Sequence, residues 1–177
     1  MPGFDQGLVD RIVGTYLELD RGLLDNGPWK FYDEYEEFLA EELQRSLPLD
    51  TSFDAQGFLD ALVRVLAREA EHAGELYVFH SSLVFGPAIS TLYSLGSERL
   101  ELDFTPFSIS TNEVVKGMEG TPENPLRLRV VLPEGHAPWL SLVGPSSKHC
   151  VFDIHGKAGY VGGGASHCEF TLHQTPH

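Results

Sequence analysis

Apolar side chains recur at every third or fourth position through the N-terminal part of the chain, the spacing of one face of an α-helix. Three stripes show this spacing: Leu8, Val9, Ile12, Val13, Tyr16, Leu17 and Leu24; Trp29, Tyr32, Tyr35, Phe38, Leu39 and Leu43; and Phe58, Leu59, Leu62, Val63 and Leu66. Gly27-Pro28 and Pro48 bound the second stripe, whereas the third follows the N-cap residues Thr51-Ser52 and ends at Gly74. The pattern predicts three amphipathic helices that bury these stripes in a core.

From Glu75 onward the pattern changes to short β-branched and aromatic runs separated by Gly, Pro and Asn. We expect strands at 75–85, 98–107, 126–132, 138–143, 149–155 and 167–173, a short helix at 87–95, and loops at 120–125 and 156–165. Helices followed by strands indicate an α+β protein, with the helices packed on one side of a mainly antiparallel sheet. We expect a single domain, 1–177, with a helical segment at 1–74 and a β-rich segment at 75–177.

Charge narrows the choice of partners. The net charge is −14, and residues 1–75 carry 17 acids against 6 bases. A field of this sign repels phosphate backbones and anionic lipid, so a basic protein is the better candidate partner. The simpler interpretation is that the acids keep helix faces solvated, as we expect for one run: Asp33, Glu34, Glu36, Glu37, Glu41 and Glu42.

The chain shows no apolar run of the ~20 residues that a membrane span needs, and the first residues do not resemble a signal peptide. We therefore expect a cytoplasmic protein. Cys150 and Cys168 are too few for a disulfide framework, and we expect both to be small core residues. The glycine motifs of nucleotide-binding loops and of serine hydrolases are missing from the sequence.

An internal repeat relates residues 149–155, His-Cys-Val-Phe-Asp-Ile-His, to residues 167–173, His-Cys-Glu-Phe-Thr-Leu-His. Alternation along a strand places the imidazoles and acids of both copies on one face: His149, Asp153, His155, His167, Glu169 and His173. If the two copies pair as a hairpin, four imidazoles and two carboxylates converge in a set that suits zinc or another first-row metal. The alternative, which we prefer at this point, is a half-buried hairpin with a solvated, His-rich face and no metal.

A second group of polar residues follows two of the expected strands. The first strand ends in His80-Ser81-Ser82, and about thirty residues later Phe107 leads into Ser110-Thr111-Asn112. These segments resemble the ADP-ribosyltransferase superfamily, in which a strand ends in a polar anchor such as His-Gly-Ser and a later strand ends in an aromatic residue before a Ser-Thr-Ser-like turn. The resemblance covers about residues 75–162. Val78 and Cys150 stand where members of the family carry an arginine and the catalytic glutamate.

The resemblance implies NAD as cofactor and transfer of ADP-ribose to a protein or small acceptor. It assigns cofactor binding to His80, Ser81, Phe107, Ser110 and Thr111, and it leaves Asp153 as the nearest candidate for the catalytic acid. Two alternatives remain open. One is a non-catalytic acidic protein of the immunity or inhibitor type, which masks a basic partner, and the other is a metal-binding module built on the His-rich repeat.

Overall fold

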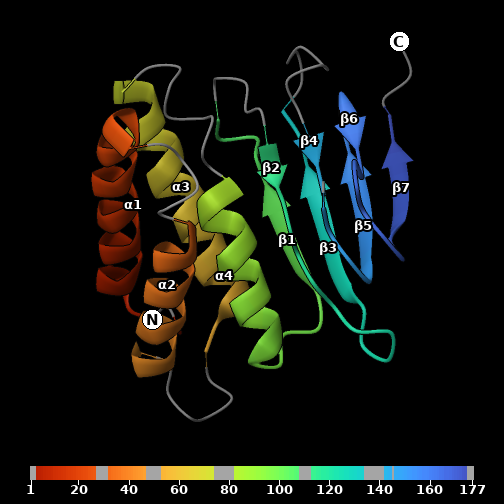
Figure 1. Ribbon diagram of the computed structural model, residues 1–177, viewed down its shortest axis with the longest axis horizontal. Coiled ribbons are helices and arrows are strands. Elements are labelled where there is room, and N and C mark those ends of the chain that lie inside the picture. Colours follow the sequence, from red (N-terminus) through yellow and green to blue (C-terminus); the bar gives the residue numbers. More distant parts are fainter. Residues whose placement is uncertain are drawn as a thin grey trace.

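The computed structural model describes residues 3–26, 32–46, 53–73, 82–107, 113–133, 142–144 and 146–174. Within these residues four helices precede the strands: α1 (Gln6–Asn26), α2 (Tyr32–Ser46), α3 (Ala55–Ala73) and α4 (Ser82–Ser94). Figure 1 shows the four helices gathered at one end of the molecule and the strands at the other. No helix in this part of the chain is long and apolar enough to cross a membrane.

The helices form where the apolar spacing predicts them. The side chains of Asp5 and Asp54 cap the starts of α1 and α3, because their Oδ1 atoms accept hydrogen bonds from the backbone N–H groups of Gly7 and Gly57 at 2.9 and 2.8 Å. The cap predicted at Thr51-Ser52 lies outside the described residues. The stripes of α1 and α3 are buried as predicted: Leu8, Val9, Ile12, Val13, Tyr16, Phe58, Leu59, Leu62, Val63 and Leu66.

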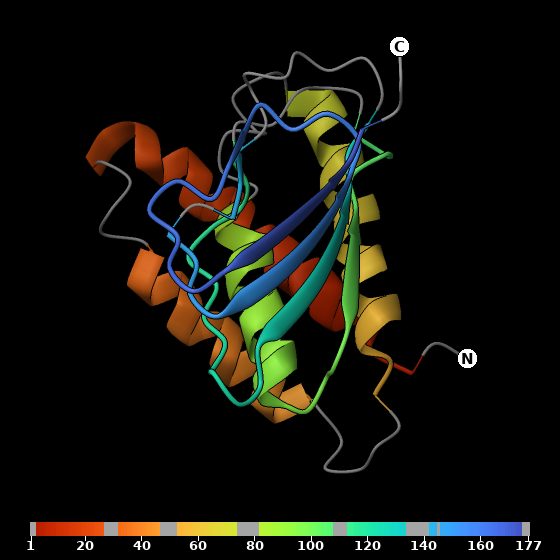
Figure 2. The ribbon, with the colours of Figure 1, turned by 90° about the vertical axis from the view of Figure 1, so that its right-hand side faces the viewer.

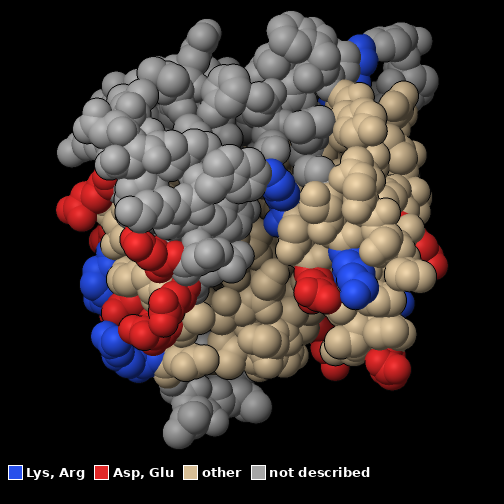
Figure 3. All heavy atoms as spheres, viewed as in Figure 1, with Lys and Arg blue, Asp and Glu red and all other residues tan. Residues whose placement is uncertain are grey.

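The acidic surface of the helices is only partly a solvated face. Glu34, Glu37 and Glu41 are exposed, as expected. Glu42, however, is largely buried and pairs with Arg11 of α1 and with Arg45 of its own helix, each at 3.2 Å. Figure 3 shows this mixture of acids and bases on the left of the molecule, where α1 and α2 lie. Glu42 therefore ties two helices together as well as carrying charge.

After α4 the chain alternates between two parallel sheets. One sheet has the order β1-β3-β5-β7 and the other the order β2-β4-β6. The strands are β1 (Leu100–Asp103), β2 (Glu113–Val115), β3 (Leu126–Val131), β4 (Leu142–Val143), β5 (Cys150–His155), β6 (Tyr160–Val161) and β7 (Glu169–His173). Because each strand of one sheet is followed by a strand of the other, the chain winds in stacked coils, the arrangement of a β-solenoid.

The last coils repeat residue by residue. Phe152 and Phe170 lie 18 positions apart in sequence and stack with ring centroids 5.0 Å apart. Gly144 and Gly162 are spaced in the same way and share φ of 70°. A Cβ at either glycine would lie within 3 Å of the phenylalanine ring of its own coil, so both the backbone angle and the close approach require glycine.

The expected α+β class is therefore confirmed, but the expected antiparallel sheet is wrong, because every pair of strands in the described residues is parallel. The expected hairpin between residues 149–155 and 167–173 is wrong for the same reason. The intervening segment contains β6 and so passes through the second sheet, which brings the chain back in its original direction. A parallel pair needs such a crossover of a dozen or more residues, and 156–168 supplies one.

The bounds of several elements in the β-rich segment also differ from those expected. Residues 82–85, expected as strand, form the first turn of α4, which begins before Pro87 and contains it. The short strands β2 and β6 were not expected, and β6 lies within the segment predicted to be a loop. The predictions at 126–132, 149–155 and 167–173 match β3, β5 and β7 closely.

The helices cover the first coil of the solenoid. The side chain of Gln56 in α3 donates to the carbonyl oxygen of Glu101 in β1 and accepts from its N–H group, both at 2.8 Å. The amide of Gln56 thus takes the place of a neighbouring strand at the edge of β1. At the other end of the sheet β7 is the last strand, farthest from the helices in Figure 1 and nearest the viewer in Figure 2.

Candidate metal-binding site

The candidate site lies on the outer face of the β1-β3-β5-β7 sheet. Along β5 the side chains alternate, and Phe152 and Ile154 are buried in the core while Asp153 and His155 are partly exposed on the opposite face. The predicted division of residues between the two faces is confirmed for this strand. Burial of the apolar face determines which side of β5 points into the core, so Asp153 and His155 point outward.

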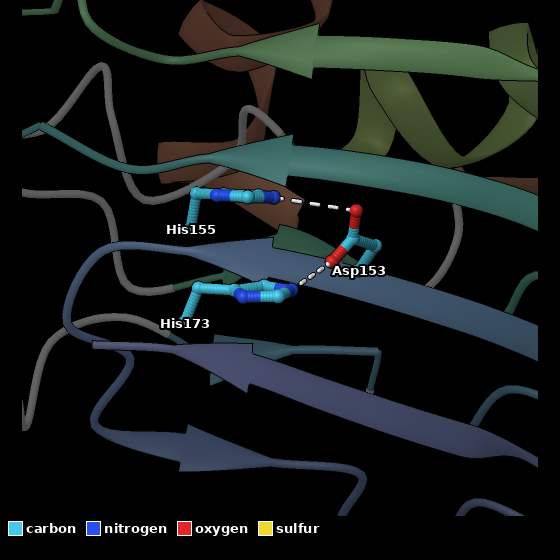
Figure 4. A group of neighbouring side chains, drawn as sticks. All are labelled: Asp153, His155 and His173. Carbon is cyan, nitrogen blue, oxygen red and sulfur yellow. Dashed lines mark hydrogen bonds and ion pairs between the residues drawn. The ribbon is translucent and has the colours of Figure 1, made fainter.

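The parallel register brings a third residue to the same place. His155 lies opposite His173 of β7, and their rings stack with centroids 4.3 Å apart and planes 10° apart. Asp153 turns toward both rings, as Figure 4 shows: its Oδ2 lies 3.2 Å from Nε2 of His155, and its Oδ1 lies 2.7 Å from Nε2 of His173. One carboxylate therefore joins two stacked imidazoles through the same ring atom of each.

The electrostatics of Asp153 reflect these contacts. Burial pushes the pKa of Asp153 upward, but the hydrogen bonds and charges of His155 and His173 together outweigh it, so the pKa lies below its ordinary value. Arg129 is in register with Asp153 on the adjacent strand, yet its guanidinium pairs with Glu101 at 3.1 Å. The carboxylate of Asp153 is thus held anionic and directed at the imidazoles.

The three side chains can each offer one ligand atom, and these atoms all lie within 4.8 Å of one another. Two imidazole nitrogens and one carboxylate oxygen form a ligand set that zinc and ferrous iron bind in proteins. With metal–ligand bonds of ~2.0–2.1 Å, neighbouring ligand atoms of a tetrahedral site lie about 3.3 Å apart. The separation of 3.2 Å between Oδ2 of Asp153 and Nε2 of His155 is close to that value, and the separation of 2.7 Å between Oδ1 and Nε2 of His173 is shorter.

The wider convergence expected from the sequence does not occur. His149 and His167 stack on one another, with centroids 4.9 Å apart, at the opposite end of β5 and β7 from His155 and His173. Both adopt positive φ, 50° and 54°, at the corner that leads into each strand. Glu169 lies opposite Val151 and so belongs to neither pair. Parallel pairing therefore places the four histidines in two separate pairs and not in the single cluster that was expected.

The residues expected to bind NAD are not brought together by the described part of the structure. Phe107 was expected to line the NAD pocket, but it is 3% exposed and stacks on Phe104 in the core, with centroids 5.1 Å apart. An apolar ring leaving β1 gains more from this burial than from an open cleft. His80, Ser81, Ser110 and Thr111 lie outside the described residues.

The cysteines do not contribute ligands to the site. Cys150 is 1% exposed, and its Sγ donates to the carbonyl oxygens of Met118 and Lys148. Burial, followed by the nearby Cys168 thiol, raises the pKa of Cys150 to about 12. A thiol in this state is not the thiolate that binds metal or attacks a substrate, and Cys150 acts as a small core residue.

Comparison of the chain with family models, with curated proteins and with solved structures finds no match. The site is therefore interpreted from its own geometry.

Sequence reasoning identified the three residues of the site but not which of them meet. The repeated spacing of 18 positions was the signal that could have selected His155 and His173, because equivalent residues of successive solenoid coils lie beside one another.

Proposed function

We propose that the chain binds a divalent first-row transition metal, zinc in the first instance, through Asp153, His155 and His173. The observation that carries the proposal is the position of the Asp153 carboxylate between the Nε2 atoms of two stacked imidazoles, at 3.2 and 2.7 Å. Three potential ligands are already placed by two neighbouring strands of one sheet, so little ordering entropy opposes metal binding. The geometry thus favours the metal-binding alternative over the solvated face.

The proposed centre has coordination positions open to solvent. The three side chains are 31–51% exposed, and no fourth histidine, cysteine or carboxylate ligand joins them among the described residues. Three protein ligands with an open fourth position are typical of catalytic zinc, where bound water becomes acidic, and closed sets of four are typical of structural zinc. The site is therefore suited to hold a metal-bound water or an anionic ligand on the sheet surface.

Zinc titration followed by calorimetry tests the proposal. We expect one zinc per chain and a zinc affinity that falls as the pH is lowered, since both imidazoles must be neutral to bind the metal. His173→Asn should lower the affinity at least about tenfold, and at a zinc concentration of ~100 Kd the wild type should gain about 2.7 kcal/mol of stability that chelation removes.

His167→Asn is the matched control, because His167 also stacks on a histidine of the preceding coil but its ring makes no hydrogen bond or ion pair with a described carboxylate. Asparagine tolerates the positive φ of His167. Equal loss of zinc binding in the two variants would show that histidine content, and not this site, holds the metal.

The NAD hypothesis and the basic-partner hypothesis stay predictions. Four of the residues on which NAD binding depends lie outside the described part of the chain. The hypothesis of a basic partner rests on the acidic helices, although one of their acids, Glu42, already forms ion pairs with Arg11 and Arg45.

A further inference from the structure

The two edges of the main sheet are treated differently. The edge of β1 is covered by Gln56 of α3, whereas β7 ends the sheet and no described strand pairs with its outer edge. The end of the core is also exposed here, since Leu172 is 43% exposed and Tyr160 is 59% exposed. An uncovered strand edge beside exposed apolar side chains is a template for another strand.

We propose that two copies of this chain pair along β7, antiparallel and related by a two-fold axis that passes beside Thr171. This register places Glu169 of each copy opposite the partner's His173, and Phe170 opposite the partner's Leu172. A carboxylate meets an imidazole on the outer face, and apolar side chains meet on the inner face. The five residues of β7 are therefore complementary to themselves when reversed, as an isologous interface requires.

The backbone of β7 is compatible with this register. The carbonyl oxygen of His173 accepts a hydrogen bond from the N–H group of Gly156 at 3.1 Å, so the backbone N–H and C=O groups of His173 face β5. Successive residues of a strand direct their N–H and C=O groups to alternate sides, so those of Phe170 and Leu172 face the open edge. In the proposed register Phe170 and Leu172 are the hydrogen-bonded pair, and the backbone groups of Thr171 are already used within the chain.

The charge distribution allows two copies to approach at this end. The helical region carries the excess of acids, 17 against 6 bases in residues 1–75. Residues 142–177 carry two acids, Asp153 and Glu169, and two bases, Lys148 and Lys157, and so have no net formal charge. Pairing through β7 keeps the two acidic regions at opposite ends of the dimer, where their mutual repulsion is screened by salt.

The pairing also completes the candidate site, a step that rests on the proposed function. Nε2 of His173 faces Asp153, and its Nδ1 makes no hydrogen bond within the described residues. Opposite side chains of an antiparallel pair have Cβ atoms ~4.5–5.5 Å apart, within reach of a glutamate. The partner's Glu169 would accept the Nδ1 hydrogen of His173 and hold Nε2 ready for metal, acting as a positioning residue.

The mass of the purified chain in solution, by sedimentation with chelator and again with zinc, tests the dimer. We expect the dimer in both conditions. Glu169→Lys should raise the dissociation constant of the dimer at least about tenfold. Because the dimer is two-fold symmetric, the substitution removes both contacts between Glu169 and the opposite His173 at once. Glu123→Lys makes the same change of charge on an exposed loop residue away from β7, and it should stay dimeric.

Circular dichroism and a thermal melt establish that each variant is folded. A wild-type chain that sediments as a monomer in both conditions would overturn the proposal, as would a Glu169→Lys variant that dimerises as tightly as the wild type.

Zinc affinity separates the two proposals. Glu169→Gln should keep one zinc per chain with an affinity about 10- to 100-fold weaker, and a Glu169→Gln variant with wild-type affinity would remove Glu169 from the site. A dimer that binds no zinc would leave the β7 pairing standing and overturn the metal site. A monomer that binds one zinc per chain would overturn the β7 pairing and leave the metal site standing.

Discussion

At the scale of single residues, the chemistry depends on which side chains the register brings together. Alternation along the strand was enough to predict that Asp153, His155 and His173 share the outer face. It could not predict that His173 lies opposite His155 while Glu169 lies opposite Val151, because that depends on the direction of the neighbouring strand. Asp153 was expected as a catalytic acid for NAD chemistry, which stays a prediction, and its contacts place it between two imidazoles.

Asp153 gives a prediction about acid stability in the metal-free protein. The pKa of Asp153 is lowered in the folded state, below the ~3.9 of an unfolded aspartate. Its contacts therefore stabilise the fold above that value, and the stabilisation is lost as pH falls through the lowered pKa. The difference in free energy of unfolding between the wild type and Asp153→Asn should shrink below about pH 4.

Urea unfolding of both proteins with chelator present, at several pH values, measures this difference. A difference that stays constant down to the acid limit of folding would mean that the carboxylate contributes no charge interaction with the two imidazoles.

At the scale of elements, the sequence predicted the helices better than the sheet. Local spacing determines a helix, and the stripes of α1 and α3 are buried as expected. Sheet direction depends on the connections, and the two-residue strand β6 is too short to leave a periodic signal. Without β6 the Gly-rich segment was interpreted as a hairpin loop, and the order of helices before strands was taken to indicate an antiparallel sheet.

The contact between α3 and β1 gives a prediction at this scale. Gln56→Ala removes two hydrogen bonds of 2.8 Å to the backbone of Glu101 and leaves the edge of β1 without that partner. We expect a loss of about 1–3 kcal/mol in the free energy of unfolding, measured by denaturant titration.

Gln6→Ala is the matched control, because Gln6 makes only an exposed side-chain hydrogen bond of 3.4 Å to Asp10. Its expected effect lies within about 0.5 kcal/mol. A Gln56→Ala variant no less stable than Gln6→Ala would mean that the amide does not support the edge of β1.

At the scale of the whole molecule, a helical, acidic end covers the first coil of a parallel solenoid, and an end without net formal charge carries the histidine pairs. This division was half predicted: the charge asymmetry and the α+β class follow from composition and order. The solenoid was not predicted, although the repeat of residues 149–155 at 167–173 contained its period. A repeat in which apolar and polar residues both recur is as typical of two stacked coils as of the two strands of a hairpin.

The central claim is that Asp153, His155 and His173 hold one metal ion. The most direct measurement is a crystal structure of the zinc-loaded protein with anomalous data collected on both sides of the zinc edge. We expect one anomalous peak per chain at ~2.0–2.2 Å from Nε2 of both histidines and from a carboxylate oxygen of Asp153. No peak at this position, or a peak only at the His149–His167 pair, would contradict the claim.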